Sequence, residues 1–253
     1  MICLNCEKCV NKGNFVSALL FLGFALSFAL LCLGGHSLIS YITDRNGTLD
    51  ASAGERPVII IDAGHGGEDG GATGVNGILE KDLNLMISDS LRCLFTVAGY
   101  NVLPTRTEDV LLYDKNSDYA GKKKVLDLAS RLELTRNNNC SLFLSIHMNS
   151  YPESKYSGAQ VFFSPNSPQS RIIAEGIQTG LRDYVQKSNH RDVKAAGKNI
   201  YLLDRMSCPS VLVECGFLSN PEECEKLCSE NYRRLLSLVL FCSVSDQMDK
   251  TTE

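Results

Sequence analysis

The sequence predicts an α/β fold: a single domain with a mainly parallel, twisted central sheet flanked by helices, preceded by one N-terminal transmembrane helix. Two observations predict the sheet. Short aliphatic runs without polar alternation, such as 58–61 and 142–146, are typical of strands covered on both faces. These runs alternate along the chain with segments of helical periodicity, as in α/β proteins. A length of 253 residues suits one such domain with a short appendage.

Helices and strands are expected in regular succession from residue 58 onward. Between 80 and 98, apolar residues recur at helical spacing until Gly99 supplies a C-terminal stop. A strand follows this helix, and the alternation then continues with another helix and a buried strand. The full expectation is strands at 58–61, 101–103, 142–146, 160–163, 199–203 and 211–213, and helices at 80–98, 125–136, 171–185, 221–228 and 232–244.

Composition narrows the function classes. A hydrophobic content of 44% and a charged content of 21% are ordinary for a folded domain, and they exclude a disordered or polytopic membrane protein. The net charge is -4, and no stripe of lysine or arginine recurs along a helix face. Because duplex-binding proteins need a basic surface, we expect no nucleic-acid partner.

The N-terminal region differs from this average. Residues 13–41 carry no Asp, Glu, Lys or Arg, and this run exceeds the roughly 20 apolar residues that span a bilayer. Lys8 and Lys12 precede it, so the positive-inside rule places the N-terminus in the cytoplasm. We therefore expect a cytoplasmic tail at 1–12, a membrane anchor at 13–41, a linker at 42–56 and a catalytic domain at 57–248. The protein would be single-pass, contact the lipid bilayer through its N-terminal helix and carry its catalytic domain outside the cytoplasm.

A cleaved signal peptide is the alternative. The apolar run is longer than the usual hydrophobic region of about 7 to 15 residues, and the small residues ASA at 51–53 lie far beyond its end. Both observations favour a retained anchor.

Eleven cysteines are many for an exported domain, but their irregular spacing does not indicate a small disulfide scaffold. Cys3, Cys6 and Cys9 form a C-x-x-C-x-x-C pattern in the expected tail. This pattern suits a metal or a cluster, although thiols in front of an anchor are more often acylated or idle. The sequence leaves the redox state of the cysteines open.

Three apolar strands run directly into ionisable residues. Asp62 and His65 follow the first strand, His147 follows the third, and Glu214 follows the last. Sites in open α/β sheets form outside the carboxyl ends of the strands, so these side chains converge if the strands are parallel neighbours. Glu80 joins them from the first turn of the following helix, where the helix dipole favours a carboxylate.

Two imidazoles and one carboxylate make the open three-ligand set of a catalytic zinc site, and a further carboxylate can act as a base. Zinc acidifies water and polarises a carbonyl, so hydrolysis of an amide is the natural reaction. Each residue has a plainer explanation when taken alone: a histidine at a strand end is usually a hydrogen-bonded core residue. The glycine-rich loop at 64–74 gives backbone freedom, and a phosphate site there is disfavoured because the P-loop ending is missing.

At these positions the chain resembles the N-acetylmuramoyl-L-alanine amidases of the zinc-dependent type 3 class. The motifs that carry the resemblance occur in the family's order: DAGHGG at 62–67, EKDLN at 80–84, TRTED at 105–109, SIHMN at 145–149 and VECGFLSN at 213–220. The resemblance implies one zinc ion per chain bound by His65, Glu80 and His147, with Glu214 as the catalytic glutamate. Two further roles are expected from position: Asn149, just beyond a ligand, would hydrogen-bond substrate, and Asp62 would orient His65 as a partner outside the ligand set.

The implied reaction is hydrolysis of the amide between the lactyl group of muramic acid and L-alanine of peptidoglycan. Within the family the chain is most similar to the short, N-terminally anchored amidases of the spore cortex, which implies a role in cortex maturation. A zinc exopeptidase acting on peptides and a membrane-tethered wall-binding protein without catalysis are the alternatives. The need for an activating protein partner stays open.

Overall fold

The computed structural model describes residues 56–250 except 115 and 117. Its sheet contains β1 (Val58–Ala63), β2 (Asn101–Pro104), β3 (Cys140–Asn149), β4 (Gln160–Phe163), β5 (Lys194–Ala195) and β6 (Ser210–Phe217). The helices are α2 (Glu80–Val97), α3 (Lys123–Asn137), α4 (Pro168–Gly180), α5 (Tyr201–Arg205), α6 (Pro221–Cys228) and α7 (Glu230–Asp249), with a π-helical turn η1 (Leu181–Val185) after α4.

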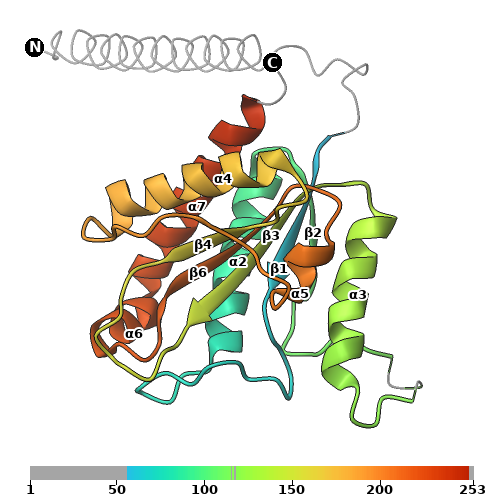
Figure 1. Ribbon diagram of the computed structural model, residues 1–253, viewed down its shortest axis with the longest axis horizontal. Coiled ribbons are helices and arrows are strands. Elements are labelled where there is room, and N and C mark those ends of the chain that lie inside the picture. The colour runs from blue at the N-terminus through green and yellow to red at the C-terminus, as the bar shows by residue number, and fades with distance from the viewer. Residues whose placement is uncertain (1–55, 115, 117, 251–253) are drawn as a thin grey trace, which may run out of the picture. The chain divides into compact units, whose positions relative to one another are not determined.

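The strands form one six-stranded sheet in the order β2-β1-β3-β6-β4-β5 (Figure 1). Strands β2, β1, β3 and β6 are parallel neighbours, whereas β4 runs antiparallel to β6 and β5 runs parallel to β4. The sheet is therefore mixed, and its parallel part contains the strands from which the predicted site residues come. Strands β1, β3 and β6 end at the same edge of the sheet.

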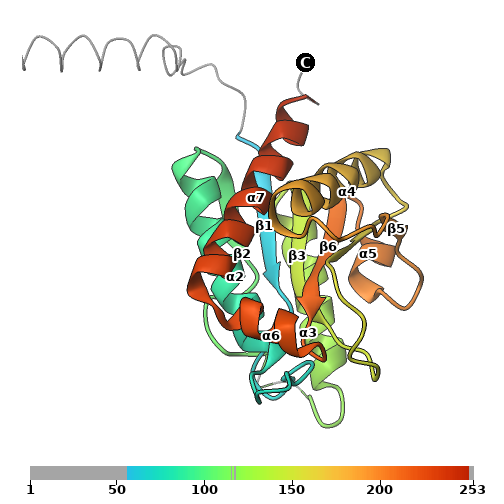
Figure 2. The same ribbon diagram turned by 90° about the vertical axis from the view of Figure 1, so that its left-hand side faces the viewer.

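Helices cover both faces of the sheet (Figures 1 and 2). In β1, Ile59 and Ile61 pack into the larger core with α2, α4 and α7. Ile60 faces the opposite way, into a second core that includes residues of α3 and α5. Because each face of the strand meets a helical layer, every residue of the isoleucine run is buried, which explains the missing polar alternation.

One predicted strand was wrong. Residues 199–203 were expected to be extended, but the chain forms the short helix α5 there, and the strand of this region is β5. Leu202 and Leu203 are both buried, as neighbours on one side of a helix are, whereas a half-covered strand would bury only every second residue. The Arg205 guanidinium lies 4.0 Å from the Tyr201 ring centroid, one helical turn back. The other predicted elements are confirmed, with helix and strand ends shifted by a few residues.

Within the described part of the chain, every helix is too short or too polar to cross a bilayer. The predicted anchor at 13–41, the tail at 1–12 with Cys3, Cys6 and Cys9, and the linker up to residue 55 lie outside the described residues. The seven described cysteines form no disulfide, although the Sγ atoms of Cys140 and Cys208 lie 2.9 Å apart.

Candidate metal centre and catalytic site

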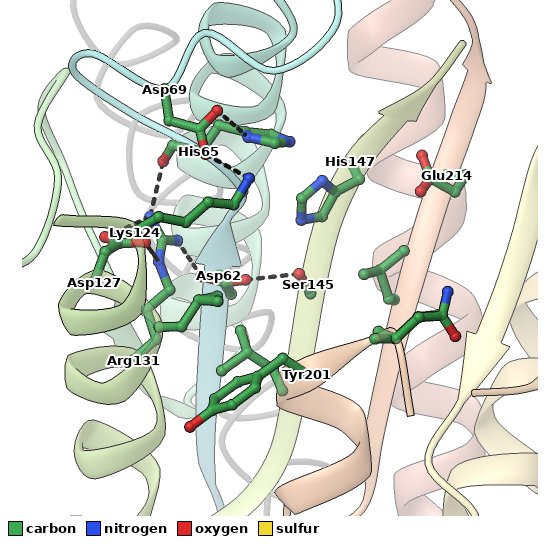
Figure 3. A pocket seen from close by; sticks show the side chains of 16 residues that line it. Asp62, His65, Asp69, Lys124, Asp127, Arg131, Ser145, His147, Tyr201 and Glu214 are labelled. Carbon is green, nitrogen blue, oxygen red and sulfur yellow. Dashed lines mark hydrogen bonds and ion pairs between the residues drawn. The ribbon is translucent and has the colours of Figure 1, made fainter. Parts of the chain in front are cut away.

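The predicted convergence is present at the carboxyl edge of the parallel strands. His147 on β3 pairs with Glu214 on β6, and Asp62 on β1 pairs with Ser145 on β3. His65 lies two residues beyond the end of β1, so the three neighbouring strands place it near the same edge. Figure 3 shows His65, His147 and Glu214 around one pocket.

Glu80 completes a group of possible metal ligands. Its Oε1 atom lies 2.9 Å from His147 Nδ1 and 3.3 Å from His65 Nε2. One ligand atom from each of the three residues lies within 4.8 Å of the others, a spacing that surrounds a common point. Both imidazoles are partly exposed while the carboxylate is nearly buried. Two histidines and one carboxylate leave further coordination positions open, so the donor set fits a catalytic zinc ion.

The backbone of the glycine-rich loop is shaped around these ligands. At Gly71, which has φ +65°, an added Cβ would lie 2.5 Å from Glu80 Oε2 and 2.8 Å from His65 Cδ2. At Gly64, an added Cβ would overlap the imidazole ring of His147. His65 itself has φ +61°, a left-handed conformation that is uncommon for a residue with a side chain. The loop backbone passes so close to the ligand side chains that no side chain fits at Gly64 or Gly71, which explains the glycines better than chain flexibility alone.

The neighbouring histidines keep the Glu80 carboxylate in its ionised state. Burial alone would raise the pKa of Glu80, but hydrogen bonds and charge from His147 and His65 outweigh it and hold that pKa far below its ordinary value. Glu80 Oε1 also accepts the backbone N–H of Met148 at 3.0 Å, and Oε2 accepts that of Ala72 at 2.8 Å. The ligand carboxylate is therefore ionised and held from both sides.

Burial works to lower the pKa of His65, yet Glu80 and Asp69 raise it above its ordinary value. His65 Nδ1 lies 3.0 Å from Asp69 Oδ1, at ion-pair distance but without the direction of a good hydrogen bond. Asp69 in turn lies 3.3 Å from Lys124 Nζ. The outer nitrogen of this ligand thus faces a carboxylate, as metal-binding imidazoles commonly do.

Glu214 has the environment of a catalytic base. Burial, opposed by His147 and reinforced by the charge of Glu80, raises the pKa of Glu214 to about 7. Its Oε2 atom is buried and has no hydrogen-bond partner among the described residues. A carboxylate that structure alone required would be satisfied by donors, so this atom is free to hold a proton.

The expected role of Asp62 in orienting His65 stays a prediction, and the structure shows which groups hold the Asp62 side chain. Its carboxylate is buried and accepts hydrogen bonds from Arg131 Nη1, from Thr105 Oγ1 at 2.9 Å and from Ser145 Oγ at 2.6 Å. Burial would raise the pKa of Asp62, but Arg131 and Ser145 bring it below its ordinary value. The link to His65 is indirect: Arg131 Nη2 donates to the His65 carbonyl at 2.8 Å.

Asn149 lies at the end of β3, and its carbonyl accepts the N–H of Leu218 at 2.8 Å. Its side chain is not among those that line this pocket, and its expected contact with substrate stays a prediction.

The pocket in front of the ligands has a volume of about 260 Å³. Helices α3 and α5 supply the wall opposite the strands, through Lys124, Leu128, Arg131, Tyr201 and Leu202 (Figure 3). Sequence reasoning missed this wall, because α5 was expected to be a strand and Arg131 was not singled out. A signal was present: Asp127 and Arg131 lie one helical turn apart on the buried side of α3.

Fold and site together define a candidate metal-dependent hydrolase, and comparison with known proteins names its family. Residues 59–239 match the Amidase_3 family, described as N-acetylmuramoyl-L-alanine amidase, and the chain belongs to that family. Among curated relatives, the germination-specific N-acetylmuramoyl-L-alanine amidase of Bacillus subtilis is 35% identical over 176 residues, which cover 70% of this chain and 73% of the relative.

Solved structures agree with this assignment. The chain is similar to the CwlD amidase from Clostridioides difficile, solved in complex with the GerS lipoprotein, with 39% identity, a TM-score of 0.73 and coverage of 77% and 99% of the two chains. It is also similar to the amidase AmiC2 of Nostoc punctiforme, with 25% identity, a TM-score of 0.66 and coverage of 76% and 97%. The resemblance inferred from the sequence motifs is confirmed.

Proposed function

We propose that this N-acetylmuramoyl-L-alanine amidase hydrolyses the amide between the muramic acid lactyl group and L-alanine of peptidoglycan, using one zinc ion held by His65, Glu80 and His147. The observation that carries the proposal is the His-Glu-His group beside Glu214, whose Oε2 atom is buried, in a chain of the amidase family. Zinc in that position would make water easier to deprotonate and would polarise the amide carbonyl.

Residues of the chain provide proton transfer, support of the ligand loop and contact with substrate. Glu214 accepts a proton from the water that attacks the lactyl carbonyl and returns it to the departing alanine nitrogen. Its raised pKa suits both steps, because a group with a pKa of about 7 exchanges protons readily near neutral pH. The products are a free peptide and a lactyl carboxylate. Asp62 supports the ligand loop through Arg131, and Asn149 is proposed to contact substrate beyond the rim of the pocket.

Fragment analysis tests this function. Purified peptidoglycan incubated with the protein should release peptides that begin with L-alanine, and a zinc chelator should stop the release. Release of single amino acids from peptide ends would instead identify an exopeptidase. Binding of the protein to peptidoglycan without any released fragment would identify a wall-binding protein that lacks catalysis.

The cellular setting belongs to the same proposal. Because one relative is named a germination-specific amidase, we propose that the substrate is the peptidoglycan of the spore cortex. The catalytic domain at 57–248 would be held outside the membrane by an anchor at 13–41, a placement supported by the uncharged run and the lysines before it. Protease added to protoplasts should digest this domain; full protection until lysis would reverse the topology.

A protein partner is proposed because the similar CwlD amidase was solved in complex with a lipoprotein. The test compares peptide release by this chain alone and with the corresponding lipoprotein of its own source. Equal rates and no complex on size-exclusion chromatography would contradict a partner.

A further inference from the structure

Arg106 is a buried cation whose hydrogen bonds go to backbone carbonyls. It follows β2, is 4% exposed and lies in the motif at 105–109, to which sequence reasoning attached no role. Nε donates to the Ala63 carbonyl at 2.9 Å, and Nη2 donates to the Gly64 carbonyl at 3.0 Å. The same Nη2 donates to the Lys81 carbonyl at 2.7 Å, and Nη1 donates to that of Glu108 at 3.1 Å. Among the described residues, no carboxylate pairs with it directly.

These carbonyls belong to the two segments that carry metal ligands. Ala63 and Gly64 immediately precede His65, and Lys81 immediately follows Glu80. One guanidinium therefore joins the end of β1 to the first turn of α2. We propose that Arg106 is a positioning residue that holds the His65 and Glu80 segments at metal-binding distance; this inference rests on the proposed metal site.

The backbone at His65 needs such a restraint. A left-handed conformation costs energy for a residue with a side chain, and it persists only where neighbouring groups fix it. Arg131 fixes one side, since it donates to the carbonyls of Ala63 and His65, each at 2.8 Å. Its charge, however, is paired with Asp62 and with Asp127 in the buried core.

Arg106 lacks such a pairing, although its burial is costly. Burial, reinforced by the nearby charge of Arg131, lowers the pKa of Arg106. An apolar side chain would fill the same space without this desolvation cost. What only an arginine supplies is a planar fork that reaches carbonyls of separate segments at once. Lysine offers a single charged nitrogen and cannot reproduce the three-carbonyl bridge among Ala63, Gly64 and Lys81.

The test measures zinc affinity by competition with a chromophoric chelator for the full chain, its Arg106→Met variant and its Arg106→Lys variant. Removal of groups that orient metal ligands typically weakens metal binding by about 10 to 100-fold. We expect a loss in that range for Arg106→Met, a smaller loss for Arg106→Lys, and a changed visible spectrum of the cobalt-substituted protein in both. Leu240→Ala in the core of α7 is the matched control: it should lower thermal stability and leave both readouts unchanged.

The outcomes separate this inference from the proposed function. Wild-type zinc affinity and an unchanged cobalt spectrum in the Arg106 variants would overturn the positioning role, while the metal site itself would stand. A wild-type chain that binds no zinc would overturn the metal site. If Arg106→Met does not fold, Arg106→Lys decides the question, because it keeps the charge and most of the aliphatic stem.

Discussion

Gly71→Ala should show whether zinc affinity depends on the close approach of the loop backbone to Glu80 and His65, as distinct from the cost of a left-handed backbone. Gly71 has φ +65°, and a side chain in the left-handed region costs about 1–2 kcal/mol. The added methyl group would also lie 2.5 Å from Glu80 Oε2 and 2.8 Å from His65 Cδ2, so both ligands would have to move. Displacing ligands in this way should weaken zinc binding by about 10 to 100-fold, which corresponds to about 1.4–2.7 kcal/mol.

Gly77→Ala is the matched control. Gly77 has φ +86° and lies later in the same connection between β1 and α2, but an added Cβ there meets nothing within 4 Å. Urea unfolding without metal should show a loss of about 1–2 kcal/mol for Gly77→Ala, from the backbone alone. Chelator competition should show wild-type zinc affinity for Gly77→Ala and the weakened affinity only for Gly71→Ala. Equal zinc affinities in the two variants would refute the arrangement of Glu80 and His65 around a shared ion.

Two further predictions concern charged groups at and beside the metal site. Asp62→Asn should lower the free energy of unfolding at pH 7 by about 3 kcal/mol, because it leaves the buried Arg131 with Asp127 as its remaining carboxylate partner. Since the pKa of folded Asp62 lies below the ordinary value of about 3.9, this stabilisation is complete above that pH and is lost as pH falls through the folded pKa. Urea unfolding should therefore show the difference shrinking below about pH 4; a constant difference would argue against the ion pair. Zinc affinity should fall as pH decreases through the raised pKa of His65, because only a neutral imidazole binds metal. In Asp69→Asn that fall should move to lower pH, and an unmoved titration by chelator competition would exclude Asp69 as its cause.

The ligand set was predictable because it depends on the parallel strands β1, β3 and β6. Each of these buried strands runs straight into polar residues, and parallel neighbours must end at one edge. The positions of His65, His147 and Glu214 then follow from the order of the strands. Glu80 could be added because it opens the helix after the loop that carries His65.

Residues that act through the backbone could not be found in this way. Arg106 donates to carbonyls, which every residue possesses, so no sequence pattern marks its partners. Asp62 was expected to orient His65, but the sequence did not show that a link between them passes through Arg131. The helix α5 was missed because five residues are too few to establish helical periodicity.

The most direct test of the catalytic account is the Glu214→Gln variant at equal zinc loading. The amide keeps a similar shape but cannot accept a proton from the attacking water. Peptides beginning with L-alanine would be counted after incubation with purified peptidoglycan and normalised to zinc-loaded, folded protein. Because general acid-base groups contribute about 10² to 10⁴-fold to a rate, the variant should bind zinc and release peptides at least about 100-fold more slowly. Release at close to the wild-type rate would contradict Glu214 as the base.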